Sequence, residues 1–388
     1  MLTWIFPPQI PLLFQLSTTT LGNATLYRTS IQTLLNAIRS LSHTFSMTYQ
    51  SIFLLGAFHA ALTLQPSMEP PSHLRIGYRT ATNPDGKRKG MKIEARDVWY
   101  TYPGESQPAI RGLNLKVEPG EVVAIVGMNG GGKSTLMHIL LRLFEAQLPN
   151  PESRFMINDL PAAVYSPSDI HAHSTAVFQN FSRLAHGSVR ENVGIGATNS
   201  MDDEAAVEEA LKEGGAWTFV KDLKDGIETR LEVGGFGGGF GAGSGMASGA
   251  MRSQRASNPM LHRRQGSHYK TSLSGGQWQR IALSRSFMRP NSDLLVLDEA
   301  SSQLDAHAQN DVFARLLSKS SPQSTRGQRT VIYITHRLST VRWADKVAFF
   351  DEGRVKEFGT HEELLRIPNG GYKALWGAFV SAGAGTGL

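Results

Sequence analysis

The chain contains no cysteine among its 388 residues, and this absence excludes disulfide bridges, thiolate zinc sites and a cysteine nucleophile. Such a composition fits a reducing compartment. The formal charge of +6 is mild and no long run of lysine and arginine accompanies it, so nucleic-acid binding is not expected. The apolar start, Met1 to Leu16, lacks a basic region and is interrupted by prolines, which argues against a secretory signal.

Charged residues are scarce at the amino-terminal end. From Met1 to Met68 the only formal charges are those of Arg28 and Arg39, whereas the later residues carry charge at an ordinary density. Two uncharged runs, Met1 to Tyr27 and Ser40 to Met68, approach the length of a bilayer span but are rich in Ser, Thr, Gln and Asn. Neither run alone has the composition of a helix that faces lipid.

The second of these runs has helical periodicity. Its large apolar residues recur near helical spacing and leave a polar face, which suits a helix in a bundle or beside a polar pathway. The apolar positions are Leu41, Phe45, Tyr49, Ile52, Phe53 and Leu64, and the polar positions are Ser42, Ser46 and Gln50. We therefore expect residues 1–66 to form a helical segment; the alternative is a core helix of a soluble domain.

Two stretches are predicted to lie outside the folded core. Residues 67–90 combine prolines with the basic cluster Lys87, Arg88 and Lys89, and indicate an exposed linker. A basic cluster beside a membrane would favour its cytoplasmic face. Gly234 to Lys270 contains no Asp or Glu and is rich in glycine in its first half, so disorder is predicted at about residues 235–270.

From Met91 the pattern changes to alternating strands and helices. Short apolar runs indicate buried parallel strands, and helical segments between them imply a doubly wound α/β core over residues 91–380. A hairpin is indicated around Asp351 to Gly353, and Thr360 with Glu363 has the spacing of a helix capping box. The apolar runs are Leu113–Val117, Glu121–Val126, Leu294–Leu297, Val331–Ile334 and Val347–Phe350.

The run GMNGGGKST, from Gly127 to Thr135, satisfies the phosphate-binding loop pattern between an apolar strand and a predicted helix. Its glycines let successive N–H groups turn toward phosphates, Lys133 can reach the β- and γ-phosphates, and Ser134 can hold Mg²⁺. The expected nucleotide-binding residues of this run are Gly127, Asn129, Gly130, Gly131, Gly132, Lys133, Ser134 and Thr135.

Asp298 and Glu299 follow the apolar strand that ends at Leu297. An acid at the carboxyl end of such a strand can meet a metal ion bound near the phosphate-binding loop, and a second acid beside it can polarise an attacking water. A solvated acidic pair at a strand end is the structural alternative.

The run LSGGQWQR, from Leu273 to Arg280, carries the most specific resemblance. Ser274 and Gln277 have capping-box spacing, so Ser274 is expected to cap a helix that Pro290 closes, with two glycines at its positive end. Because this run lies between a phosphate-binding loop and a carboxylate-tipped strand, the chain resembles the ATP-binding cassette (ABC) ATPases.

The resemblance implies a P-loop NTPase fold of the ABC ATPase type, with a RecA-like parallel-sheet core, an antiparallel β subdomain and a helical signature subdomain. It implies ATP and Mg²⁺ as cofactors and Glu299, His336 and Lys133 as catalytic residues. Ser134, Gln179 and Asp298 would lie on the metal side. Tyr102 would stack on adenine, although Tyr100 or Trp99 could do so instead.

Several motifs are most similar to exporter-type cassettes, among them HRLST at His336 to Thr340 and GTHEELL at Gly359 to Leu365. In such exporters a transmembrane domain precedes the cassette, and residues 1–66 resemble a remnant of one. Two cassettes then close head to tail, as a homo- or heterodimer, with ATP between Lys133 of one and Ser274, Gly275, Gly276 and Gln277 of the other. The implied location is a membrane, with the ATPase domain cytoplasmic.

Two departures from the family leave alternatives open. The stretch at 235–270 is an insertion before the signature, and Gln303 occupies a position where exporters usually have a small residue. The chain could therefore be a cassette that binds ATP with little turnover. A soluble ABC ATPase in a non-transport complex is the other alternative, although no long coiled coil separates the phosphate-binding loop from the signature.

Overall fold

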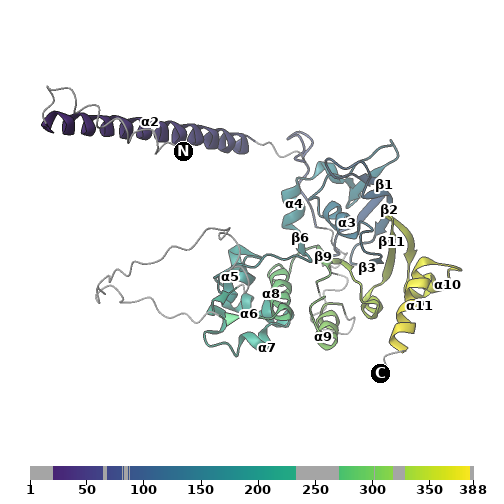
Figure 1. Cartoon of the computed structure of the whole chain (residues 1–388). Coiled ribbons are helices and arrows are strands. Elements are labelled where there is room, and N and C mark those ends of the chain that lie inside the picture. Colours follow the sequence, from purple (N-terminus) through teal and green to yellow (C-terminus); the bar gives the residue numbers. More distant parts are fainter. Residues whose placement is uncertain are drawn as a thin grey trace. The chain divides into compact units, whose positions relative to one another are not determined.

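The computed structural model describes residues 21–63, 68–80, 82, 86, 88–232, 271–300, 302–317 and 328–384 (Figure 1). By their internal contacts, the residues divide into two compact units, Met1–Ser67 and Met68–Leu388. The predicted disordered insertion at 235–270 lies outside the described residues.

The described residues of the first unit form one long helix, α2, over Leu21–Leu62. None of its described side chains is buried. Threonine hydroxyls along α2 donate to carbonyl oxygens one turn earlier, as Thr29 does to Thr25 and Thr33 to Thr29, both at 2.9 Å. Within the described residues, no helix combines the length and the apolar character needed to cross a membrane.

The core of the second unit is a six-stranded sheet in the order β12-β11-β3-β10-β9-β6. Its strands pair in parallel except for β12, which forms an antiparallel hairpin with β11. Every residue of β3, β9 and β10 is buried, because these central strands are covered on both faces. The bounds are β3 Val122–Gly127, β6 Ser174–Val177, β9 Leu294–Asp298, β10 Thr330–Ile334, β11 Lys346–Asp351 and β12 Arg354–Gly359.

A four-stranded antiparallel sheet, in the order β2-β1-β4-β5, packs against this core. Its inward residues, such as Ile93, Leu113 and Ile157, share one buried cluster with helix α3 and with residues of the parallel sheet. The turn at Pro119–Gly120 therefore joins strands of different sheets, β2 and β3. The bounds are β1 Ile93–Tyr100, β2 Ile110–Val117, β4 Arg154–Ile157 and β5 Leu160–Pro161.

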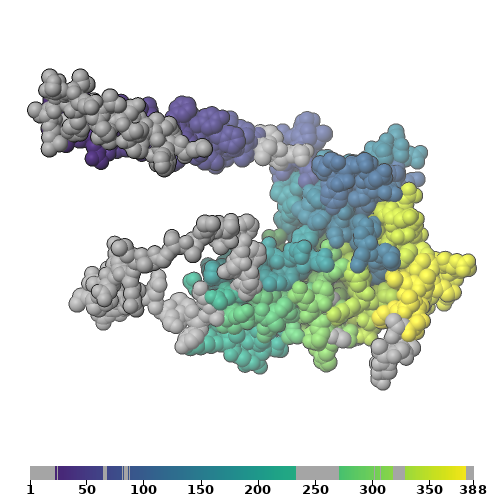
Figure 2. Space-filling view, in the orientation of Figure 1, coloured from purple at the N-terminus to yellow at the C-terminus, as the bar shows by residue number. Residues whose placement is uncertain are grey.

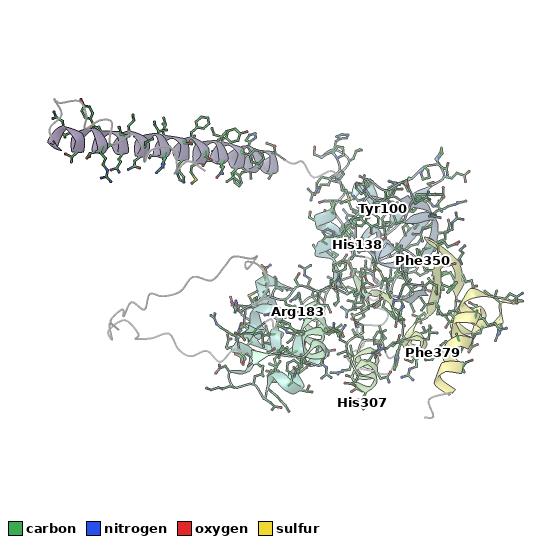
Figure 3. The ribbon with its side chains drawn as sticks, in the orientation of Figure 1. Tyr100, His138, Arg183, His307, Phe350 and Phe379 are labelled. Atoms are coloured by element: carbon green, nitrogen blue, oxygen red, sulfur yellow. The ribbon has the colours of Figure 1, made fainter. Side chains whose placement is uncertain are left out.

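Some helices cover the sheets, and others, α5, α6 and α7, form a separate cluster around α8. Figures 1 and 2 show this cluster, in teal and green, on the opposite side of the unit from the hairpin β11–β12 and from α10 and α11. It has its own buried core, which includes Trp278, and Arg183 lies over the rings of Phe181 and Trp278 (Figure 3). The α-helices are α3 Lys133–Leu140, α4 Pro167–Ala172, α5 Val189–Gly194, α6 Glu204–Glu213, α7 Trp217–Val220, α8 Gly275–Phe287, α9 Ala306–Leu317, α10 His361–Arg366 and α11 Gly371–Ala384. Short 3₁₀ helices lie at Ala162–Val164, Thr198–Ser200, Gly226–Glu228 and Leu338–Trp343.

The two predicted capping boxes are present. Ser274 accepts the backbone N–H of Gln277 at the start of α8, and Thr360 accepts that of Glu363 at the start of α10. In both, the side chain of the third helical residue accepts a hydrogen bond from the backbone N–H of the N-cap residue, so two N–H groups at each helix end are satisfied. α8 ends at Phe287, shortly before Pro290.

The short strands β7, Leu231–Glu232, and β8, Thr271–Ser272, pair in parallel. The Thr271 N–H also donates to the Arg230 carbonyl oxygen at 3.1 Å. The chain therefore leaves the helical cluster and re-enters it at neighbouring positions, just before Ser274.

Residues 68–80 begin the second unit and pack against its core. Most of their side chains are exposed, as expected of a linker, but Tyr78 is partly buried and its hydroxyl donates to Asp293 at 3.0 Å. Its ring also packs on His173, with 4.4 Å between ring centroids. Asp293 is fully buried and pairs with Arg88 as well, at 3.0 Å. The expectation of an exposed linker is thus wrong at Tyr78 and Arg88.

We expect Tyr78→Ala to destabilise the protein by roughly 2 kcal/mol, because the change removes a packed ring and one bond to a buried carboxylate. Urea denaturation of the full chain measures this. Leu74→Ala is the matched control in the same segment, since Leu74 is 54% exposed. Equal effects of the two changes would show that Tyr78 does not anchor the segment.

Candidate functional site

The predicted phosphate-binding loop connects the end of β3, at Gly127, to the start of α3, at Lys133. At Gly127 φ is 154° and an added Cβ would lie 1.9 Å from the Phe350 carbonyl oxygen; at Gly132 φ is 98° and the distance to the Ala109 carbonyl oxygen would be 2.6 Å. Only glycine fits at both positions. No side chain caps the amino end of α3, which leaves first-turn N–H groups available to an anion.

Lys133 is 6% exposed and folds back over this loop. Its ammonium donates to the carbonyl oxygens of Gly127, at 3.1 Å, and Met128, at 2.7 Å. Burial lowers the pKa of Lys133, while the nearby carboxylates of Glu299 and Asp298 act in the opposite direction. The loop thus holds a cation at the place where a phosphate chain would lie.

Asp298 is the last residue of β9 and is 4% exposed. Burial raises its pKa, and the neighbouring charge of Glu299 acts in the same direction, whereas a hydrogen bond from Ser134 lowers it. The buried Oδ1 atom of Asp298 has no hydrogen-bond partner among the described residues. Ser134 and Asp298 are therefore adjacent, and they present an unsatisfied oxygen of the kind that a hard divalent cation binds.

Glu299 lies between Gln179 and His336. Its Oε2 atom accepts a hydrogen bond from the Gln179 side chain at 3.0 Å, and its Oε1 atom contacts the Nε2 atom of His336. The three residues come from different chain positions: Gln179 follows β6, Glu299 follows β9 and His336 follows β10. The structure thus brings together the predicted base, the predicted catalytic histidine and a glutamine that was expected on the metal side.

Tyr102 lies beside the phosphate-binding loop, and its hydroxyl oxygen is 2.9 Å from that of Thr135. Its ring is edge-on to those of Tyr100 and Phe144, with centroids 5.1 and 5.6 Å away. Tyr100 is only 8% exposed and stacks on Phe144, while the indole N–H of Trp99 donates to Asp97. Of the three aromatic candidates, Tyr102 is the one that lines the cavity beside the phosphate-binding loop.

The cavity has a volume of about 480 Å³ and is lined by residues of the phosphate-binding loop together with Tyr102, Gln179, Glu299 and His336. Of the predicted residues of the phosphate and metal side, Gly127, Gly131 and Asp298 do not line it directly. Its lining residues are Tyr102, Ala109, Asn129, Gly130, Gly132, Lys133, Ser134, Thr135, Gln179, Glu299 and His336.

The signature residues Ser274 to Gln277 do not line this cavity. They lie at the amino end of α8, where Ser274 and Gln277 bond to each other. The glycines contact the loop after Glu299: a Cβ at Gly275 would lie 2.6 Å from the side-chain oxygen of Gln303. The structure therefore does not bring the signature to the phosphate-binding loop of the same chain.

Sequence reasoning missed several residues around the site. Ala109 lines the cavity, and Phe144 supports Tyr102. His138 on α3 lies between Phe144 and Phe178, at 4.8 and 5.5 Å between ring centroids, and burial lowers its pKa (Figure 3). The contacts of Phe144 with Tyr102 and of His138 with Phe178 join distant chain segments, so no local motif could have revealed them.

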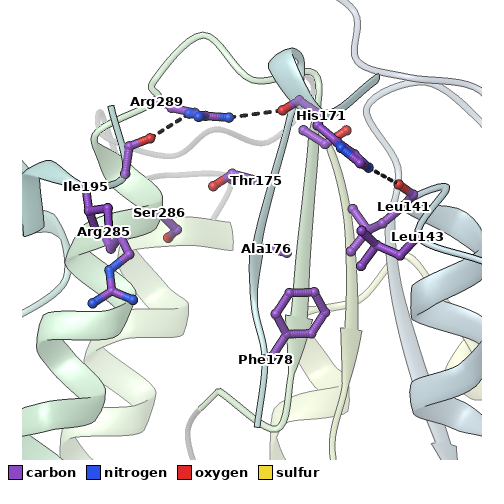
Figure 4. A pocket seen from close by; sticks show the side chains of 12 residues that line it. Leu141, Leu143, His171, Thr175, Ala176, Phe178, Ile195, Arg285, Ser286 and Arg289 are labelled. Carbon is purple, nitrogen blue, oxygen red and sulfur yellow. Dashed lines mark hydrogen bonds between the residues drawn. The ribbon is translucent and has the colours of Figure 1, made fainter. Parts of the chain in front are cut away.

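A second cavity, of about 290 Å³, lies between β6 and the α8 cluster (Figure 4). Leu141, Leu143 and Phe178 supply its apolar side. Arg289 spans it by donating to the carbonyl oxygens of Gly196, at 2.6 Å, and His171, at 3.0 Å. The cavity thus reaches Phe178, the residue before Gln179.

Comparison with known proteins matches residues 110–302 to the ABC transporter domain. The ATP-dependent lipid A-core flippase of Hahella chejuensis is 30% identical over 284 residues, which is 73% of this chain and 40% of the flippase. The protein of the same name from Xanthomonas campestris pv. campestris is 30% identical over 348 residues, which is 90% of this chain and 49% of that protein. The chain thus spans less than half the length of these relatives.

A solved structure, that of a bacterial Atm1-family ABC exporter with ATP bound, superposes with a TM-score of 0.64 at 23% identity. The superposition covers 94% of this chain and 54% of the exporter chain. The predicted fold, a P-loop NTPase of the ABC ATPase type with an antiparallel β subdomain, a helical subdomain and a preceding helix, is confirmed.

We expect Lys133→Ala to weaken ATP binding by about tenfold or more, because a charge-assisted bond contributes about 1.5–3 kcal/mol. Isothermal titration calorimetry with ATP measures this. Lys116→Ala is the control, since Lys116 is exposed and pairs with Glu118 away from the cavity. Unchanged affinity in the Lys133 variant would remove Lys133 from the phosphate site.

Proposed function

We propose that this chain is the ATP-binding and ATP-hydrolysing subunit of an exporter-type transporter. The premise is that the chain belongs to the ABC transporter family by its residues 110–302. One observation carries the hydrolytic part of the proposal. The Glu299 carboxylate lies between Gln179 and His336, and all three residues line the same cavity as the phosphate-binding loop.

In this proposal each residue has a separate task. The backbone of residues 127–132 and the ammonium of Lys133 hold the phosphate chain. Glu299 accepts a proton from the attacking water, and its contacts with His336 and Gln179 orient the carboxylate. Tyr102, which also lines the cavity, supplies an aromatic face for the adenine.

The oxygen atoms around Ser134 fit a magnesium ion. The Ser134 hydroxyl, the orphaned Oδ1 atom of Asp298 and the side-chain oxygen of Gln179 would hold it. Bound Mg²⁺ would neutralise charge on the β- and γ-phosphate oxygens.

The signature residues act on a second cassette in this proposal. Ser274 caps α8 and lies outside the cavity of its own chain, so a nucleotide reaches this helix end only when another cassette presents it. The positive end of α8 and its two glycines suit a phosphate. Two chains, identical or different, would enclose two ATP molecules.

The transport role draws on the relatives and on the chain before the cassette. The Xanthomonas match spans 348 residues, more than the unit Met68–Leu388 contains, so the likeness reaches into residues 1–67. We therefore assign residues 1–66 to part of a transmembrane domain, 67–90 to a linker and 91–380 to the ATPase domain. The cavity beside Phe178 and Gln179 is where a transmembrane partner would contact the cassette.

We expect Glu299→Gln to lower ATP turnover by about 100-fold or more while leaving ATP affinity unchanged, because the amide cannot accept the proton of water. Phosphate release measures turnover, and size-exclusion chromatography with ATP should show an accumulated dimer. Glu208→Gln is the control, since Glu208 lies on α6 and pairs with Lys212. Undiminished hydrolysis in the Glu299 variant would refute the assigned base.

We expect the native protein to remain with membranes after carbonate extraction, in complex with membrane helices and with its ATPase domain on the cytoplasmic side. Fractionation of cells that produce the tagged full chain, followed by protease protection, measures this. Recovery in a soluble complex without a membrane partner would favour a non-transport ABC ATPase.

A further inference from the structure

Gln279 lies on α8, just after the signature residues, and is 2% exposed. Its side-chain amide donates to the carbonyl oxygen of Glu299, at 3.3 Å, and to the hydroxyl of Ser302, at 3.4 Å. Its side-chain oxygen accepts the N–H of Gln303 at 2.8 Å. A buried amide is costly unless paired, and this amide finds all of these partners in the loop that follows β9.

Glu299 has an uncommon backbone conformation for a residue with a side chain. Its φ is 49°, in the left-handed region. Such a conformation persists when the surroundings hold it in place. The Glu299 N–H donates to the Ile334 carbonyl oxygen at 3.3 Å, and its own carbonyl oxygen accepts the Ser302 N–H at 3.0 Å and the Gln279 amide. The backbone of Glu299 is thus held in part by a side chain of α8.

The loop after Glu299 is also packed on the signature glycines. A Cβ at Gly275 would meet the side-chain oxygen of Gln303 at 2.6 Å, and one at Gly276 would meet its carbonyl oxygen at 3.0 Å. On its other side, Arg337 donates to the carbonyl oxygens of Ser302, at 3.1 Å, and Leu304, at 2.9 Å. The loop therefore contacts the helix capped by Ser274 and the residue next to His336.

We propose that Gln279 is a positioning residue that ties the signature end of α8 to the backbone of Glu299. A shift of α8 when Ser274 meets the nucleotide of a second cassette would then move the carboxylate that serves the chain's own nucleotide. This inference rests on the proposed function, because it takes Glu299 as the base. It gives Gln303 a role as well: its backbone N–H donates to the Gln279 side-chain oxygen, and its side chain covers Gly275.

The test compares two variants of the full chain. Gln279→Met keeps the volume but removes all of the hydrogen bonds, and Gln279→Glu keeps the acceptor for the Gln303 N–H but removes both donors. Because the bond to the Glu299 carbonyl oxygen is lost in each, we expect kcat for ATP to fall about tenfold in both variants. KM and ATP affinity should stay close to those of the unchanged chain, whereas the unfolding midpoint falls in both variants because buried polar groups lose their partners. Ser284→Ala is the control, since Ser284 is buried on the same helix and donates to the Arg280 carbonyl oxygen.

The outcomes separate the two proposals. An unchanged kcat in Gln279→Met, or a loss in that variant but not in Gln279→Glu, would overturn the link to Glu299. A fall of kcat together with weaker ATP binding in both variants would make Gln279 a packing residue only. If Glu299→Gln hydrolyses ATP normally, the proposed base fails; if it is inactive while both Gln279 variants are normal, only this inference fails.

Discussion

The shared register of three parallel strands is the constraint on which the site depends. Ile334 of β10 lies opposite Ile125 of β3 on one side and Asp298 of β9 on the other. The three strands therefore end at one edge of the sheet, where the chain continues into the phosphate-binding loop, Glu299 and His336. If one strand slipped by one residue against its neighbour, the side chains of that strand would turn to the other face of the sheet, and the residues of the site would no longer lie together.

Burial in the same place also sets the electrostatics. Low solvent access lowers the pKa of Lys133 and raises that of Asp298, so burial disfavours both charges. Their attraction opposes this effect, but the Oδ1 atom of Asp298 still has no partner among the described residues. In the proposed function, a phosphate chain with a divalent cation would supply a partner of opposite sign to each residue. The filled site would then be electrostatically more stable than the empty one.

Local features of the fold were predictable from the sequence, whereas contacts between distant segments were not. The strands at Leu294–Leu297 and Val331–Ile334 and the caps at Ser274 and Thr360 depend on a few adjacent residues, so their patterns are explicit. Tyr78 instead finds Asp293 from far along the chain, and nothing local in residues 67–90 indicates that contact. For the same reason the motifs identified Glu299 but not Gln279, whose role depends on how α8 packs.

The pairing of β7 with β8 fixes the chain just before the signature, so the position of the signature need not depend on how many residues lie between the two strands. For a flexible chain, each doubling of the length between two fixed ends costs only about 0.6 kcal/mol. Leu231 and Thr271 pair through their own backbone, so the chain approaches Ser274 from a point beside the one where it left the helical cluster. A change in the length of the chain between these two strands would therefore act on the candidate nucleotide site through this one pair of strands.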